Sequence, residues 1–337
     1  YNPDLYPEPL LSTRMTYAAA LETMLSRGAG KSVLMQEYGS TSAQFDPERQ
    51  ARYYNTLMYS ALAAGNQGFV AWCFTDADPE VQYRRAPYKR NPHETQFGIT
   101  DYRRNDLPHG QEMRRMSQVL RQLDLKGIEP ASIEAGIVVP HEWAVGPDYN
   151  QYGLPADKLY QYAPENILNY RTDTYANQVL TQSWLSTFIL CRQAGIHVGF
   201  PREADDWSQV RLLLTPMPAT STWGYHLYSS FWGQVRPHVA AGATLYASLS
   251  AASAIPLPDS SELFGANLAD RALWRPQVQL TFVEDFFGIR AGEVFEFQAS
   301  PGLLGTGVVL NVHNASILAR DQDGNPALLV RELENGH

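Results

Sequence analysis

The sequence predicts an α/β protein with a β-rich C-terminal segment. Apolar strand-like runs alternate with amphipathic helical runs in residues 1–127, the alternation restarts near residue 134, and helical patterning ends near residue 270. Alternation at this spacing is typical of parallel βα units, whereas short apolar runs without a helical period are typical of antiparallel strands. We therefore expect three parts: residues 1–127, 134–265 and 270–337.

Composition limits the class of partner. The 337 residues are 44% hydrophobic, which is enough for more than one packed core, and the net charge of -9 is unsuited to nucleic acid. No apolar run reaches the ~20 residues of a membrane span. We expect a neutral small-molecule partner, no nucleic acid, no membrane, no cofactor and no metal. Because the chain opens at Tyr1, we expect a piece of a longer protein, and its location stays open.

The first part reads as alternating helices and strands. Ser12 is a plausible N-cap of the first helix, and Pro47 suits the first turn of the second. The run that ends at Glu37 is too short and too apolar for a surface helix. The expected elements are a helix over Leu11–Arg27, a strand over Ser32–Glu37, a helix from Asp46 to about Ala64, a strand over Gly68–Thr75, a polar stretch over Asp76–Pro108 and a helix over Gly110–Leu123.

The second and third parts follow a boundary near Leu125–Pro130, where helical periodicity stops. In the second part, strand and helix alternate again as in an open α/β sheet. The expected strands are Ala135–Pro140, Ile196–Phe200, Val210–Thr215 and Ala243–Ser248, with helices over Tyr175–Ala194 and Trp223–Val239; the third part has strands over Val278–Val283, Glu293–Phe297 and Val308–Val312.

Candidate chemistry lies where the first two strands end. Functional side chains of parallel βα proteins gather at the carboxyl ends of strands, and Glu37 and Trp72 both fall there. A carboxylate held rigidly at a strand end can act on a glycosidic bond, and an indole face can pack on a sugar ring. Asp76 could accept hydrogen bonds from sugar hydroxyls. The alternatives are a solvated or ion-paired Glu37 and a core Trp72.

Two stretches carry a resemblance to a known family. Lys31–Gly39 (KSVLMQEYG), followed by a helix and then Gly68–Asp76 (GFVAWCFTD), resembles strands seven and eight of the clan A glycoside hydrolases, which include family 5 and the family 42 beta-galactosidases. Phe97–Asp101, before the last helix, fits as well. The resemblance covers residues 1–125 and implies the C-terminal part of a (β/α)8 TIM barrel.

The resemblance also implies site residues and a domain order. It makes Glu37 the nucleophile of a retaining β-glycosidase, with Trp72, Asp76 and Tyr38 binding the carbohydrate substrate. In family 42 a flavodoxin-like or amidotransferase-like domain follows the barrel and serves trimerisation. Residues 134–265 resemble that domain, so a homo-oligomer through it is possible, and residues 270–337 resemble the β-rich, sandwich-like segment that follows.

The sequence departs from the family at the acid/base residue. That Glu ends strand four, normally after an Asn, and no Asn-Glu pair occurs in this chain. We therefore expect a fragment that holds only two barrel strands and lacks the acid/base group. The alternative functions are a non-catalytic carbohydrate-binding module and an oligomerisation module. The sequence leaves open which sugar and linkage are recognised, and whether action is endo or exo.

Two further motifs have a simpler interpretation than a site. Asp321-Gln-Asp-Gly-Asn-Pro326 resembles the start of a calcium loop, but the downstream ligand spacing is not met, which favours a hairpin turn. Cys191 lies in a helical run and not in a strand-to-helix turn, which argues against an amidotransferase nucleophile.

Overall fold

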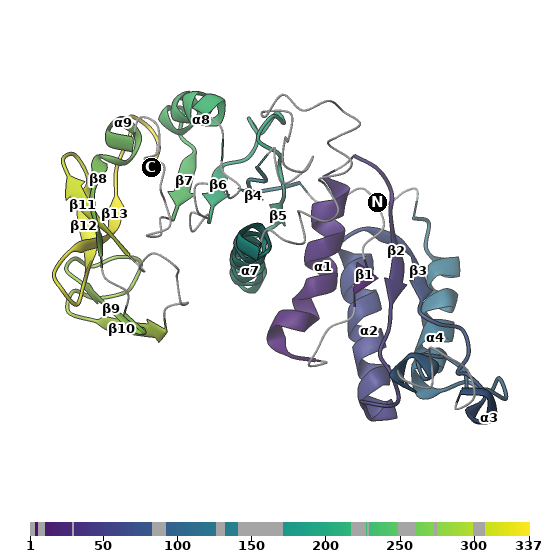
Figure 1. The fold of residues 1–337 in the computed structure, drawn as a ribbon. Coiled ribbons are helices and arrows are strands. Elements are labelled where there is room, and N and C mark those ends of the chain that lie inside the picture. Colours follow the sequence, from purple (N-terminus) through teal and green to yellow (C-terminus); the bar gives the residue numbers. More distant parts are fainter. Residues whose placement is uncertain are drawn as a thin grey trace, which may run out of the picture. The chain divides into compact units, whose positions relative to one another are not determined.

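A computed structural model describes residues 4–5, 11–28, 30–82, 92–125, 132–140, 171–216, 227, 229–248, 260–272, 275–298 and 307–337. The chain divides into two compact units (Figure 1). Unit 1 comprises residues 1–132 with 188–193, and unit 2 comprises residues 133–187 with 194–337.

Unit 1 alternates helices with parallel strands, as expected. Ser12 caps the first helix by accepting a hydrogen bond from the Met15 N–H, and the Asp46 carboxylate caps the second by accepting from two N–H groups of its first turn. The elements are β1 (Asp4–Leu5), α1 (Thr13–Arg27), β2 (Val33–Tyr38), α2 (Pro47–Ala63), β3 (Asn66–Ala71), α3 (Pro79–Gln82), the 3₁₀ helix η1 (Pro92–Thr95) and α4 (Pro108–Gln122).

The sheet of unit 1 has three parallel strands in the order β1-β2-β3. The expectation of two strands is therefore corrected: Asp4–Leu5 forms a further strand beside β2, and a two-residue strand is too short to leave a periodic signal. The strand expected over Gly68–Thr75 ends at Ala71. Two short helices, α3 and η1, lie in Asp76–Pro108, which was expected only to be a polar stretch.

The two faces of this sheet differ in burial. Met35 and Tyr38 of β2 are buried in one core with residues of the helices α1, α2 and α4, and Val33 is buried as well. On the other face, large apolar side chains are exposed, Leu34 by 41% and Val70 by 50%; just beyond β3, Phe74 is exposed by 64%. Parallel sheets normally have both faces covered. We call this exposed side, with Leu34, Val70 and Trp72, the open face.

Unit 2 contains a second parallel sheet, in the order β5-β4-β6-β7. In chain order this is 2-1-3-4, the order of a flavodoxin-like sheet. The strands are β4 (Ala135–Ile137), β5 (Val198–Gly199), β6 (Leu212–Thr215) and β7 (Thr244–Ala247), and the helices are α8 (Ser229–Ala240) and α7 (Arg171–Gln193), whose last six residues, 188–193, belong to unit 1. The helix expected from Trp223 begins at Ser229 instead, and residues 223–226 lie outside the described residues. Cys191 is buried within α7.

The C-terminal part is β-rich, as expected, and belongs to the same compact unit. One antiparallel sheet has the order β10-β9-β12-β13, and a second pairs β11 with β8. The elements are α9 (Ser260–Phe264), β8 (Ala266–Ala272), β9 (Gln277–Phe282), β10 (Val294–Gln298), β11 (Gly307–Val312), β12 (Ser316–Asp321) and β13 (Pro326–Val330).

The chain end returns to the flavodoxin-like sheet. The N–H of Leu245 in β7 donates to the His337 carbonyl at 2.9 Å, and Leu333 is buried in the core beside α8. At Gly336 a Cβ would lie 2.0 Å from the Val239 carbonyl oxygen, so only glycine fits there. The tail therefore ties the β-rich part to the α/β part of unit 2.

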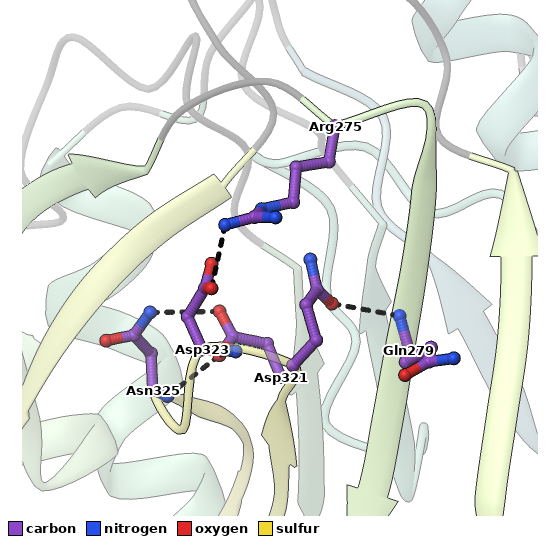
Figure 2. A network of polar contacts seen from close by, with 6 residues as sticks. Arg275, Gln279, Asp321, Asp323 and Asn325 are labelled. Atoms are coloured by element: carbon purple, nitrogen blue, oxygen red, sulfur yellow. Dashed lines mark hydrogen bonds and ion pairs between the residues drawn. The ribbon is translucent and has the colours of Figure 1, made fainter.

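The turn between β12 and β13 uses its acidic residues internally (Figure 2). One oxygen of Asp321 accepts from the N–H groups of Asp323 and Asn325, and the other accepts from the Asn325 amide. Asp323 pairs with Arg275 at 2.7 Å. The carboxylates suspected of calcium binding thus hold a hairpin turn, which is the favoured interpretation of this motif.

Unit 1 contains the same turn in a different sequence. Asp101 accepts from the N–H groups of Arg103 and Asn105 and from the Asn105 side chain, each at 2.8 Å. The residue before the Asn is left-handed in both turns: Arg104 has φ 66° and Gly324 has φ 82°. A non-glycine residue is disfavoured in that conformation by roughly 1 kcal/mol.

Substitutions of the left-handed residue in the two turns should have opposite effects on the free energy of unfolding. Arg104→Gly relieves a left-handed arginine and should raise the free energy of unfolding of unit 1 by about 0.5–1 kcal/mol, whereas Gly324→Ala should lower that of unit 2 by about 1 kcal/mol. Nothing lies within 4 Å of a Cβ at Gly324, so the second effect is conformational. Urea unfolding of the full chain measures both; a loss of stability in Arg104→Gly would contradict the account.

Candidate active site

Glu37 lies at the carboxyl end of the central strand of unit 1. Its Cα is paired with that of Asp4 in β1, and the next residue, Tyr38, is paired with Ala71 in β3. The register shifts between Met35 and Tyr38, and Tyr38 points into the helix-side core. Successive side chains of a strand point to opposite faces, so Glu37 lies on the open face, where it is half-buried.

Trp72 is placed beside this strand end by a backbone hydrogen bond. Its N–H donates to the Tyr38 carbonyl at 2.9 Å, which extends the β2–β3 pairing by one residue. The indole is 47% exposed, and Val70, two residues before it, is exposed on the same face. The peptide bond from Trp72 to Cys73 is cis. Glu37 and Trp72 therefore stand on adjacent strand ends of one face, as the sequence predicts.

A segment distant in sequence holds the chain beyond Trp72. Residues Phe97–Asp101, which we call the strap, pair with Cys73–Asp76 in a parallel arrangement. The Cys73 N–H donates to the Phe97 carbonyl at 2.9 Å. The Thr100 N–H donates to the Phe74 carbonyl at 3.1 Å, and the Asp76 N–H donates to the Thr100 carbonyl at 2.9 Å. The strap thus continues the sheet past the end of β3.

Two glycines allow the strap to fit between its neighbours. A Cβ on Gly98 would lie 2.1 Å from the Asp76 nitrogen, and a Cβ on Gly110, in the first turn of α4, would lie 2.1 Å from the Ile99 carbonyl oxygen. Neither position has room for a side chain, because the nearest atoms belong to backbone. The strap is therefore packed tightly on both sides.

Asp76 is anchored through one carboxylate oxygen. Its Oδ1 accepts from the Gly98 N–H at 2.8 Å, and no second partner is recorded among the described residues. Partial burial raises the pKa of Asp76, the Gly98 hydrogen bond opposes that rise, and the nearby Asp101 carboxylate adds to it. A carboxylate with one oxygen fixed and one available can accept a hydrogen bond from a ligand hydroxyl.

The expected role of Tyr38 in substrate binding is corrected. Its side chain is fully buried, with its ring 5.1 Å from that of Tyr54 and its hydroxyl in contact with the Met113 sulfur. Burial raises the pKa of Tyr38 well above its ordinary value. The irregular register before Tyr38 turns this residue toward the helices, and it belongs to the core and not to an exposed binding surface.

Sequence reasoning missed the residues that support the site, Gly98 and His109. Phe97–Asp101 entered only through the family resemblance. The His109 ring nitrogen Nε2 lies 2.8 Å from the Gly98 carbonyl oxygen, and His109 carried no sequence signal because this is a tertiary contact. Every helix in the described part of the chain falls short of the length and apolar character that a bilayer crossing requires. Those same residues bring together no group of three or more metal-binding side chains.

Known structures share this fold, although no protein-family model and no curated protein sequence matches the chain. An exo-beta-1,4-mannosidase from Opitutaceae bacterium strain TAV5 has a TM-score of 0.68 at 18% identity and covers 99% of this chain. Gan42B, a GH42 beta-galactosidase from G. stearothermophilus, has a TM-score of 0.66 at 15% identity, and the beta-galactosidase from Bacillus circulans sp. alkalophilus has 0.66 at 14%, each again over 99% of this chain.

The chain spans only about half of each of these proteins: 53% of the mannosidase and 45% and 46% of the two galactosidases. The similarity includes both units, because it covers nearly all of the chain. The resemblance to clan A glycoside hydrolases is therefore confirmed at the level of the fold, an α/β fold related to the TIM-barrel glycosidases.

Proposed function

We propose that Glu37 is the nucleophile of a retaining β-glycosidase, and that Trp72 and Asp76 bind the sugar that it attacks. The observation that carries this proposal is the placement of Glu37 and Trp72 on adjacent parallel strand ends of one sheet face, joined through the Trp72 N–H and the Tyr38 carbonyl. This is the place where βα enzymes hold reacting groups.

The chemistry follows from the residue types. The Glu37 carboxylate would attack the anomeric carbon as the glycosidic bond breaks, forming a glycosyl-enzyme ester that water later hydrolyses with retention of configuration. Trp72 offers an apolar surface to the C–H groups of the ring. The available oxygen of Asp76 would accept from a hydroxyl of the same sugar. Because the similar solved structures are a β-mannosidase and β-galactosidases, we propose a β-linked hexoside as the substrate class.

The acid/base group belongs, in this proposal, to the part of a barrel that covers the open face. Leu34 and Val70 are exposed there, although parallel strands are normally covered on both sides. The solved structures with this fold are about twice as long. A second carboxyl about 5–5.5 Å from Glu37 would complete a retaining pair. We propose that the chain is a fragment that contributes the nucleophile half of that pair.

An assembly role for unit 2 remains a prediction. The flavodoxin-like strand order supports the resemblance on which it rests. Light scattering of the protein over a range of concentrations measures the oligomeric state. A strict monomer would contradict the assembly role without affecting the assignment of Glu37.

Glu37→Gln should abolish glycoside hydrolysis. With 2,4-dinitrophenyl β-galactoside and β-mannoside, whose leaving groups need no protonation, kcat/KM should fall by about 10³-fold or more because the amide cannot form the ester. Glu48→Gln is the matched control, since Glu48 is an exposed carboxylate in the first turn of α2. Unchanged hydrolysis in Glu37→Gln would contradict the nucleophile assignment, and sugar binding without any hydrolysis by the wild type would favour a non-catalytic module.

Asp76→Asn should stabilise the fold while weakening sugar binding. Burial raises the pKa of Asp76, so the ionised carboxylate is disfavoured in the folded protein at neutral pH, and an amide still accepts from the Gly98 N–H. The gain should vanish below about pH 3.8, where Asp76 is itself protonated.

Asp101→Asn is the control, because we expect it to change the stability of the fold in the opposite direction. The hydrogen bonds from Asn105 lower the pKa of Asp101, so its ionised form stabilises the fold above its ordinary pKa and the substitution should destabilise it. Urea unfolding at pH 7 and pH 3, with galactose and mannose titrations, measures these effects. Lower stability of Asp76→Asn at pH 7 would make Asp76 a structural residue.

A further inference from the structure

We propose that His109 is a positioning residue that holds Asp76 in its sugar-binding place by way of Gly98. The inference rests on the proposed role of Asp76, but the link from His109 through Gly98 to Asp76 can be tested without any sugar. It connects the first turn of α4, the strap and the chain beyond β3 through two hydrogen bonds.

Within the described part of the chain, the His109 side chain makes a single hydrogen bond. The ring is fully buried, its Nε2 lies 2.8 Å from the Gly98 carbonyl oxygen, and its centroid lies 4.9 Å from that of Tyr54. A carbonyl oxygen only accepts, so Nε2 carries the proton and donates. Burial lowers the pKa of His109, which favours the neutral ring. The buried Nδ1 has no partner among the described residues, so the side chain acts through Nε2.

Gly98 links His109 to Asp76, because both of its backbone polar groups are hydrogen-bonded. Its carbonyl accepts from His109, and its N–H donates to Asp76 Oδ1 at 2.8 Å. The close packing of Gly98 against the backbone at Thr75 and Asp76 leaves little room for movement. If the His109 bond is lost, we expect the Gly98 N–H to turn away from the carboxylate more often.

The surroundings of Asp76 make such a change measurable. Burial raises the pKa of Asp76, the Gly98 hydrogen bond lowers it, and the Asp101 carboxylate adds to the rise. The Cys73 thiol interacts electrostatically with both Asp76 and Glu94, so Cys73 and Glu94 are further titratable groups of this region. Loosening the Gly98 bond therefore removes a stabilising contact of the ionised carboxylate, and the pKa of Asp76 should rise further.

The experiment compares His109→Leu, which lacks a donor, with His109→Gln, whose amide can donate to Gly98, in the full chain. NMR measures the hydrogen-exchange rate of the Gly98 amide and the titration of the Asp76 carboxyl carbon. His238→Leu is the matched control: His238 Nε2 lies 2.8 Å from the Val210 carbonyl oxygen and its ring 5.0 Å from that of Trp207, in unit 2. If His109→Leu does not fold, His109→Met fills the volume without a donor.

We expect His109→Leu to exchange the Gly98 amide at least about tenfold faster, a change of about 1.4 kcal/mol, and to raise the Asp76 pKa. His109→Gln should restore both quantities, and His238→Leu should change neither. A folded His109→Leu with unchanged Gly98 exchange and Asp76 titration would overturn the proposal. If both change while galactose and mannose binding is absent even in the wild type, the positioning link stands and the proposed sugar site fails.

Discussion

The parallel pairing of β2 and β3, and its continuation through the strap, is the constraint on which the site depends. The Trp72 N–H reaches the Tyr38 carbonyl only because the two strands run in the same direction and end together. Beyond that point the strap replaces a neighbouring strand and satisfies the backbone of Cys73–Asp76. These backbone hydrogen bonds define the path of this segment, and the positions of Trp72 and Asp76 follow from it.

The register shift in β2 gives two neighbouring residues different roles: Tyr38 is a core residue and Glu37 is the candidate nucleophile. The register shift before Tyr38 directs its ring into the helix-side core and leaves its neighbour, Glu37, on the open face. The core then fixes the position of the Glu37 Cα, because Tyr38 packs against Tyr54 and Phe69. A strand backbone that is fixed in this way holds the Glu37 side chain at a defined place on the open face, which suits a group that must react.

Helices and strands with strong local sequence patterns were predicted correctly. The apolar run before Glu37, the Pro47 helix start and the alternation of strands and helices all correspond to observed elements. Sequence reasoning failed where structure is set by tertiary contacts or very short segments, as in β1 and the strap. Tyr38 was misassigned because a register shift leaves no mark in the order of residues. His109 was missed because its partner is a backbone carbonyl eleven residues away.

The central claim is that Glu37 forms a covalent bond to the sugar. The most direct measurement is incubation with 2,4-dinitrophenyl 2-deoxy-2-fluoro-β-galactoside and its β-mannoside counterpart, followed by peptide mapping by mass spectrometry. The leaving group needs no acid, and the fluorine slows hydrolysis of the ester, so the nucleophile is labelled even without an acid/base partner. We predict a fluoroglycosyl group on Glu37; a label on another carboxylate, or none with either sugar, would contradict the nucleophile assignment.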